Sequence, residues 1–260
     1  MSNYITYSRA LLIDSLMFFG FFQKIIGRRW VSQWNKKYVL AEQELSVLLQ
    51  ILKKDSIVFD IGANRGELSF FFAVNCGAKE VFSFEPQHRM FGILQGVAKN
   101  IKNVIPINVA LSDSVKEKIL RIPVKTTGRY TPAASFEQLF ENNFKEERVV
   151  VETIDSFVIK NNIAKVDFIK CDTEGHELAV FRGAEKTLAR LRPLLYIEIK
   201  EANKELVFDF LKNKGYLPYK WNNETSCLAT VNGTQIIRSE NYYFFPTENK
   251  KWAMRTFKHQ

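Results

Sequence analysis

Short apolar segments alternate with amphipathic ones from residue 57 towards the C-terminus. The apolar segments have the length of buried strands, and the segments between them space their apolar residues as on one helix face. The strands predicted in this way are 57–61, 80–84, 104–107, 166–171 and 194–199. The predicted helices are 42–52, 67–75, 87–99, 155–161, 175–190 and 204–214. Such alternation predicts a doubly wound, mostly parallel α/β sheet.

Other segments are predicted to form strands outside this alternating pattern. Residues 118–124 and 148–152 are predicted to be exposed or edge strands around a polar insert. Near the C-terminus, 216–221, 228–237 and 242–245 are strand-like, and Asn232-Gly233 is typical of a two-residue hairpin turn. An antiparallel edge is therefore expected at that end of the sheet. The helix at 42–52 is expected to bury one face, formed by Leu45, Leu48, Leu49 and Leu52.

The chain is expected to divide into an N-terminal helical extension (1–54), one large domain (55–250) and a basic tail (251–260). Residues 10–22 of the extension are strongly apolar, and Lys24, Arg28 and Arg29 follow them. This run is too short to span a bilayer and lacks a signal-peptide cleavage site. It is expected to pack onto the domain. The alternative is a helix lying at the inner face of the membrane, with its aromatic side chains and basic cluster acting together.

The composition restricts the expected compartment, metal sites and partners. The three cysteines (Cys76, Cys171 and Cys227) have no Cys-x-x-Cys spacing, which favours a reducing, cytoplasmic compartment and disfavours a disulfide framework. Three histidines among 260 residues disfavour a multi-histidine metal site. The net charge of +9 favours an anionic partner or surface, but an excess of positive charge is common and carries little weight here.

The strongest local signal is the segment 58–66, which reads VFDIGANRG. Glu85 follows at the end of the next strand, about 20 residues later, a spacing typical of a strand–helix–strand unit that binds an adenosine cofactor. Gly62 and Gly66 do not form the Gly-x-Gly-x-x-Gly motif that holds a pyrophosphate. Asp60 would repel a diphosphate, whereas it suits the cationic amine and sulfonium of S-adenosylmethionine. The alternative is an ordinary turn between a strand and a helix.

Carboxylates end four of the predicted strands, where a doubly wound sheet binds its ligand. They are Asp60, Glu85, Asp172 with Glu174, and Glu198. Converging carboxylates repel one another unless a positive charge lies between them. That charge could come from the sulfonium, from Lys170, or from a divalent cation held by Asp172, Glu174 and Glu198. The alternative is that some of these acids, such as Glu174, only cap helices.

Several segments together resemble one known family, the FkbM-type S-adenosylmethionine-dependent methyltransferases. The matching segments are VFDIGANRG, FSFEP, VETIDSF, VDFIKCDTEGHE and NYYFFP, within roughly residues 40–246. The resemblance implies the class I methyltransferase fold, which is Rossmann-like, with a seven-stranded sheet whose last strand is antiparallel. The first 40 residues and the insert at 125–147 lie outside it.

The resemblance also implies roles for individual residues. Asp60, Gly62 and Asn64 would line the methionine end of the cofactor, in the loop that Gly66 closes. Glu85 would bind the ribose, and Asn108 and Ala110 would edge the adenine. The family signature Lys-x-Asp-x-Glu-Gly-x-Glu would lie beside the transferred methyl group and is matched by Lys170, Asp172, Glu174 and Glu177. Asp172 is the expected base or metal ligand, and His176 is the alternative base.

The expected function is S-adenosylmethionine-dependent O-methylation of a hydroxyl on a sugar, glycan or glycolipid precursor. One alternative is a soluble secondary metabolite as acceptor, and another is a non-catalytic nucleotide- or membrane-binding module. Nucleic-acid bases are disfavoured, because the Asn/Asp-Pro-Pro-aromatic motif is absent after the fourth strand, where the chain has Asp172-Thr173-Glu174-Gly175.

Overall fold

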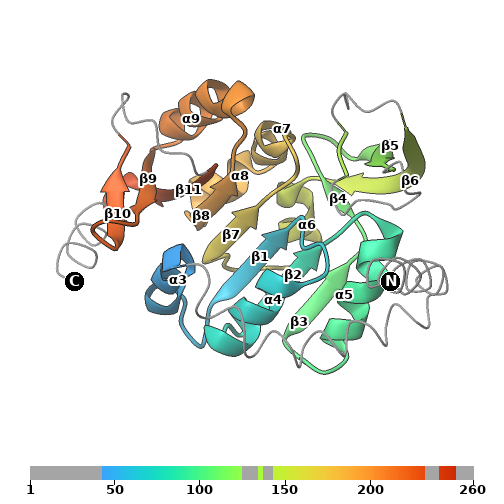
Figure 1. Cartoon of the computed structure of the whole chain (residues 1–260), viewed down its shortest axis with the longest axis horizontal. Helices are drawn as coiled ribbons and strands as arrows, with labels where there is room; N and C mark the ends of the chain where they lie inside the picture. Colours follow the sequence, from blue (N-terminus) through green and yellow to red (C-terminus); the bar gives the residue numbers. More distant parts are fainter. Residues whose placement is uncertain (1–42, 125–133, 137–142, 232–239, 250–260) are drawn as a thin grey trace, which may run out of the picture.

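The computed structural model describes residues 43–124, 134–136, 143–231 and 240–249 (Figure 1). The predicted apolar helix at 10–22, the turn at Asn232-Gly233 and the tail at 251–260 lie outside these residues. Within them, no helix is both long and apolar enough to cross a membrane.

A single large sheet forms the centre of the domain (Figure 1). Among the described residues it has eight strands in the order β10-β9-β11-β8-β7-β1-β2-β3. In chain order these are β1 (Ile57–Ile61), β2 (Glu80–Phe84), β3 (Val104–Ile107), β7 (Phe168–Cys171), β8 (Leu194–Glu198), β9 (Tyr216–Asn222), β10 (Cys227–Thr230) and β11 (Asn241–Pro246). Strands β3, β2, β1, β7 and β8 are parallel, which confirms the predicted doubly wound sheet.

The antiparallel strands lie at the other end of the sheet. Strand β11 runs antiparallel to both of its neighbours, β8 and β9, and β10 forms the antiparallel edge. Apart from β10, this is the strand order of a class I methyltransferase, in which the last strand lies between the two strands that precede it in the sequence. The resemblance implied seven strands. The eighth is β10, which pairs with β9 through Leu228 and Trp221.

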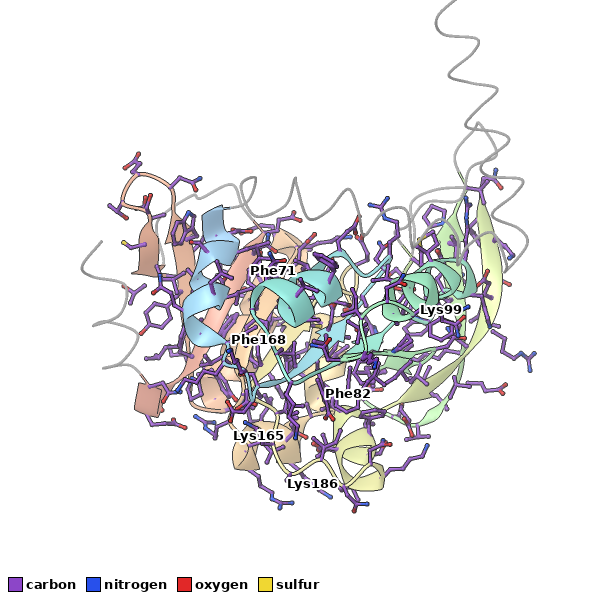
Figure 2. The ribbon with its side chains drawn as sticks, turned by 90° about the horizontal axis from the view of Figure 1, so that it is seen from below. Phe71, Phe82, Lys99, Lys165, Phe168 and Lys186 are labelled. Atoms are coloured by element: carbon purple, nitrogen blue, oxygen red, sulfur yellow. The ribbon has the colours of Figure 1, made fainter. Side chains whose placement is uncertain are left out.

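Helices cover both faces of the sheet, which explains why every residue of β1 and β7 is buried. One face carries η1 (Gln43–Leu45), α3 (Ser46–Ile51), α4 (Glu67–Phe70), η2 (Phe71–Asn75) and α5 (His88–Ala98). The other carries α6 (Ile154–Lys160), α7 (Glu177–Arg182), α8 (Glu185–Arg190) and α9 (Lys204–Asn213). Figure 2 shows the two apolar layers, with Phe71 and Phe168 in the first and Phe82 in the second.

A small second sheet contains the predicted strands around the insert. It consists of β4 (Ala110–Leu111), β5 (Lys116–Pro123) and β6 (Phe144–Glu152), in the order β4-β6-β5. Its own apolar cluster includes Leu120, Ile122 and Val151. Because β4 follows directly after β3, this sheet stands beside the carboxyl end of the large sheet.

Two of the predicted helices differ from expectation. The helix at 175–190 is two helices, because it breaks near Gly183, whose carbonyl accepts a hydrogen bond from Asp155 N–H in place of a helical partner. The helix at 42–52 begins with the 3₁₀ turn η1, and Leu45, Leu48 and Leu52 are buried as predicted. Leu49 differs from the prediction, because it is 44% exposed, while Val47 is buried.

Candidate active site

Two cavities open at the carboxyl edge of the parallel strands. The first has a volume of about 630 Å³ and is lined by the ends of β1, β2, β4 and β7, including Gly62, Asn64, Glu85 and Ala110. The second has a volume of about 650 Å³ and is lined by Glu67, Leu68, Lys170, Cys171, Asp172, Tyr196, Glu198 and Asn241. Both volumes include space that is open to the solvent. Among the described lining residues, only Asp172 belongs to both cavities.

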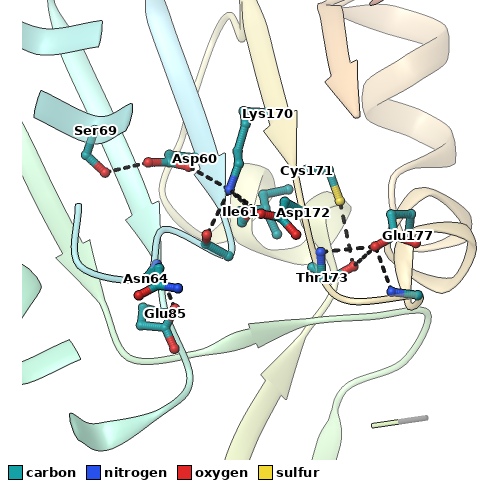
Figure 3. Close-up of polar contacts among 12 residues, drawn as sticks. Asp60, Ile61, Asn64, Ser69, Glu85, Lys170, Cys171, Asp172, Thr173 and Glu177 are labelled. Carbon is teal, nitrogen blue, oxygen red and sulfur yellow. Dashed lines mark hydrogen bonds and ion pairs between the residues drawn. The ribbon is translucent and has the colours of Figure 1, made fainter. Parts of the chain in front are cut away.

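Lys170 connects the loops that follow β1 and β7 (Figure 3). Its Nζ donates hydrogen bonds to the carbonyls of Gly62 (2.8 Å) and Ile61 (3.1 Å). The same ammonium lies 3.5 Å from Asp60 Oδ1 and 3.7 Å from Asp172 Oδ2. Burial by itself would lower the pKa of Lys170, but the carboxylates of Asp172 and Asp60 raise it above its ordinary value. The ammonium therefore stays charged and holds the two loops together.

Asp60 is completely buried at the end of β1. Its Oδ2 accepts a hydrogen bond of 2.5 Å from the hydroxyl of Ser69 on α4, as Figure 3 shows. Its Oδ1 has no hydrogen-bond partner in the described part of the chain and lies at ion-pair distance from Lys170. Asp60 is in the wall of neither cavity, so the structure places this predicted cofactor residue behind the loop after β1, where Ser69 and Lys170 hold it.

The loop after β1 has the backbone that its sequence predicts. Gly62 has φ +69°, and a Cβ at this position would lie 1.9 Å from the carbonyl oxygen of Asp172. Asn64 also has a left-handed backbone, with φ +51°, and its N–H donates a 2.8 Å hydrogen bond to Glu85 Oε2. The loop therefore needs glycine at 62 to approach β7 closely, and it touches the end of β2 through Asn64.

Glu85 is held between two backbone donors. Besides Asn64, the N–H of Gln87 donates a 2.8 Å hydrogen bond to Glu85 Oε1. Burial raises the pKa of Glu85 to about 7, although these hydrogen bonds and Lys170 act in the opposite direction. Each carboxylate oxygen keeps a second lone pair, so the group can accept two further hydrogen bonds from adjacent hydroxyls in the first cavity.

The other predicted cofactor residues divide into two groups. Ala110 and its neighbour Val109 line the first cavity. Asn108 is not among the lining residues, and its side-chain amide donates to the carbonyls of Glu85 (2.8 Å) and Pro86 (3.0 Å). Gly66 begins α4 with φ +90°, and a Cβ there would meet the side chain of Leu94 at 2.7 Å. The structure thus places Asn108 and Gly66 behind the cavity wall, where they shape the loops.

Glu177 organises the loop that follows β7. Its Oε1 accepts hydrogen bonds of 3.0 Å from the N–H and the hydroxyl of Thr173 and from the N–H of Gly175 (Figure 3). The carboxylate is 1% exposed and belongs to the wall of neither cavity. This last acid of the signature therefore fixes the loop that presents Asp172.

Glu174 and His176 lie at the first cavity but already have partners. Glu174 has φ +55°, and its Oε2 forms a 2.7 Å ion pair with Lys200. His176 Nε2 lies 2.9 Å from the hydroxyl of Ser112, and its ring packs edge-on against Phe136. His176 is thus on the apolar side of the first cavity and does not line the second.

Glu198 ends β8 and lines the second cavity. Its pKa is raised to about 7 by partial burial and by the neighbouring carboxylates of Asp172, Glu174 and Glu240. Two polar side chains of the same cavity are held by Glu44 in η1. Glu44 Oε1 accepts hydrogen bonds from the hydroxyl of Tyr196 (2.6 Å) and from Asn241 Nδ2 (3.0 Å).

The predicted metal ligands Asp172, Glu174 and Glu198 are not assembled as a metal site. In the described ranges, no group of three or more His, Cys, Asp or Glu side chains could hold a metal ion. Glu174 is directed to Lys200 instead.

Several residues that line the two cavities were not predicted from the sequence. Leu120 reaches the first cavity from the small sheet, and Ser135 and Phe136 reach it from within the insert. Tyr196 and Asn241 reach the second cavity. The polar Asn241 immediately before the apolar run of β11 was a usable signal, because that strand begins at the carboxyl edge of β8. The insert carried no such pattern.

Comparison with known proteins agrees with this geometry. The family model described as "Methyltransferase FkbM domain" matches residues 60–218. The hexuronic acid methyltransferase AglP of Haloferax volcanii is 27% identical over 161 residues, which are 60% of this chain and 61% of that protein. The chain thus spans less than two thirds of that relative.

A solved structure shows the same fold. The methyltransferase FkbM from Methylobacillus flagellatus KT superposes with a TM-score of 0.50 and 18% identity, covering 75% of this chain and 44% of that one. The family match covers more than half of the chain, and it includes every predicted site acid from Asp60 to Glu198. The chain therefore belongs to the FkbM methyltransferase family.

Proposed function

We propose that this methyltransferase uses S-adenosylmethionine to methylate a hydroxyl oxygen of a glycan or glycan precursor. The observation that carries the proposal is the meeting of the two cavities at Asp172. The first cavity has the groups that an adenosine cofactor needs. The second offers a separate place for an acceptor, beside the same carboxylate.

The residues of the first cavity fit the cofactor. Glu85 can accept both ribose hydroxyls while it keeps its hydrogen bonds to Asn64 and Gln87. Gly62 and Asn64 line the same cavity and would face the methionine part. The apolar wall formed by Val109, Leu111 and Phe136 suits an adenine ring. When bound, S-adenosylmethionine supplies a methyl group on a sulfonium, which is an excellent leaving group.

The second cavity would hold the acceptor, with Asp172 as proton acceptor. Asp172 is one-third exposed at the junction of the cavities, and the ammonium of Lys170 fixes its position from the other side. A carboxylate placed there can orient a hydroxyl and take its proton during transfer. The glycan class is inferred from the name of the Haloferax relative, which acts on hexuronic acid.

The cofactor is tested by the variant Glu85→Ala. Loss of the charge-assisted ribose bonds is expected to weaken S-adenosylmethionine binding by about 1–3 kcal/mol, measured by calorimetry. Glu80→Ala is the matched control, because it removes a carboxylate from the other end of β2 and should leave affinity unchanged. Binding of NAD without binding of S-adenosylmethionine would contradict the proposal.

The affinity for S-adenosylmethionine is expected to depend on pH through Glu85. Because the pKa of this carboxyl is about 7, it is protonated below pH 7 and loses part of its capacity to accept ribose hydrogen bonds. Affinity should therefore rise between pH 6 and pH 8 and then level off. Without ligand, the same raised pKa means that fold stability falls as pH rises from 4.5 towards 7. Calorimetric titrations across this range would check the first effect, and Glu85→Gln should remove it.

A further inference from the structure

We propose that the second cavity selects an uncharged hydroxyl as the methylated group and rejects a carboxylate, with Glu198 as the specificity-determining residue. This inference rests on the proposed function and deepens it. Hexuronic acids carry both kinds of oxygen, hydroxyl and carboxylate, so the choice between them decides whether the product is an ether or an ester.

The charges around the second cavity are the first argument. Its wall contains three carboxylates (Glu67, Asp172 and Glu198), and among its described residues only Lys170 is cationic. Glu67 is neutralised by an ion pair of 2.5 Å with Arg65. Lys170 shares its single positive charge between Asp172 and the buried Asp60. The side chain of Glu198 has neither a hydrogen bond nor an ion pair with any other described residue. A negative charge thus remains, and it would repel an acceptor carboxylate.

The hydrogen-bond donors of the cavity are the second argument. A bound carboxylate needs N–H or O–H donors, since its oxygens only accept. The Tyr196 hydroxyl hydrogen is already donated to Glu44, and Asn241 donates one N–H to the same oxygen. Two of the donors of Lys170 point to the carbonyls of Ile61 and Gly62. The wall is therefore rich in acceptors, which complements hydroxyl groups, because each hydroxyl brings its own donor.

Within this wall, Glu198 can accept a hydrogen bond from a hydroxyl neighbouring the reacting one. Asp172, at the junction, takes the proton of the reacting hydroxyl. The oxygen of that hydroxyl bonds to the methyl carbon, the carbon–sulfur bond breaks, and its electron pair stays on the sulfur. The products are a methyl ether and S-adenosylhomocysteine, so charge and atoms balance without a further reactant.

The product linkage tests the inference directly. The full chain is incubated at pH 8, above the pKa of about 7 of Glu198, with methyl-labelled S-adenosylmethionine and cell-envelope or small-molecule fractions of the source organism. Treatment of the labelled product with mild alkali should leave the label bound, because an ether resists hydrolysis. Release of labelled methanol would reveal an ester and overturn the inference while leaving methyl transfer intact. Label in no fraction would overturn the proposed function, and the inference with it.

A second measurement tests Glu198 itself. Methyl glucoside should inhibit the labelling reaction at least about tenfold more strongly than methyl glucuronoside, because the latter carries a carboxylate into the negative wall. The variant Glu198→Gln should narrow this difference and raise the KM for the acceptor more than it lowers kcat. Glu240→Gln is the control, because this neighbouring carboxylate is exposed and lies outside the cavity wall, so the preference should persist. If methyl glucuronoside inhibited the wild-type protein as strongly as methyl glucoside, or more strongly, this result would contradict the inference.

Discussion

Replacement of Gly62 by alanine is expected to abolish detectable binding of S-adenosylmethionine and to destabilise the fold. The added Cβ would lie 1.9 Å from the carbonyl oxygen of Asp172, a backbone atom that cannot rotate away. The loops after β1 and β7 would have to separate, which would disrupt the 2.8 Å hydrogen bond from Lys170 to the Gly62 carbonyl. We expect the free energy of unfolding to fall by more than about 3 kcal/mol, because backbone strain and a core clash act together.

The glycine at position 77 provides the matched control for this prediction. Gly77 has φ +71°, close to the +69° of Gly62, but the nearest atom to its Cβ would be Lys54 Cγ at 3.9 Å. Gly77→Ala should therefore show the cost of the left-handed backbone alone, about 1–2 kcal/mol, with cofactor affinity unchanged. Urea unfolding and calorimetry of both variants give the comparison. Similar results for the two variants would show that the close approach to Asp172 is unimportant.

The variant Asp172→Asn is expected to lower turnover by roughly 100-fold or more while S-adenosylmethionine affinity changes little. The amide keeps the size of the side chain but cannot take a proton from the acceptor hydroxyl. Because most cofactor contacts are made by other residues of the first cavity, binding should survive. Single-turnover methyl transfer and calorimetry separate the two quantities.

Two neighbouring residues serve as comparators for Asp172. Glu174→Gln breaks the ion pair with Lys200, and His176→Gln changes the contact with Ser112, yet neither residue lines the second cavity. Both variants should retain much more activity than Asp172→Asn. A near wild-type rate for Asp172→Asn, together with a large loss in either comparator, would move the proton acceptor to that residue.

The acids at the strand ends were predictable because the sequence pattern locates where each strand stops. Parallel strands end at the same edge of a sheet, so Asp60, Glu85, Asp172 and Glu198 had to gather there. The left-handed turn at Gly62 was predictable for a similarly local reason, since the glycine follows the strand directly.

The rest of the site depends on contacts between distant segments. Phe136 reaches the first cavity from within the insert, and Glu44 reaches Tyr196 across 152 positions of sequence. Glu177 matched the signature beside Asp172, but only the fold reveals that its carboxylate is directed at the backbone of its own loop. Likewise, the helical spacing of the leucines does not distinguish the exposed Leu49 from the buried Leu48.

The sharing of Asp172 alone between the two cavities bears on the kinetic order of the reaction. Since the described walls are otherwise separate, neither ligand has to cross the place of the other to reach the junction. With the cofactor and the acceptor placed as proposed, either substrate could bind first and either product could leave first, so the enzyme could exchange S-adenosylhomocysteine for S-adenosylmethionine while the acceptor stays bound.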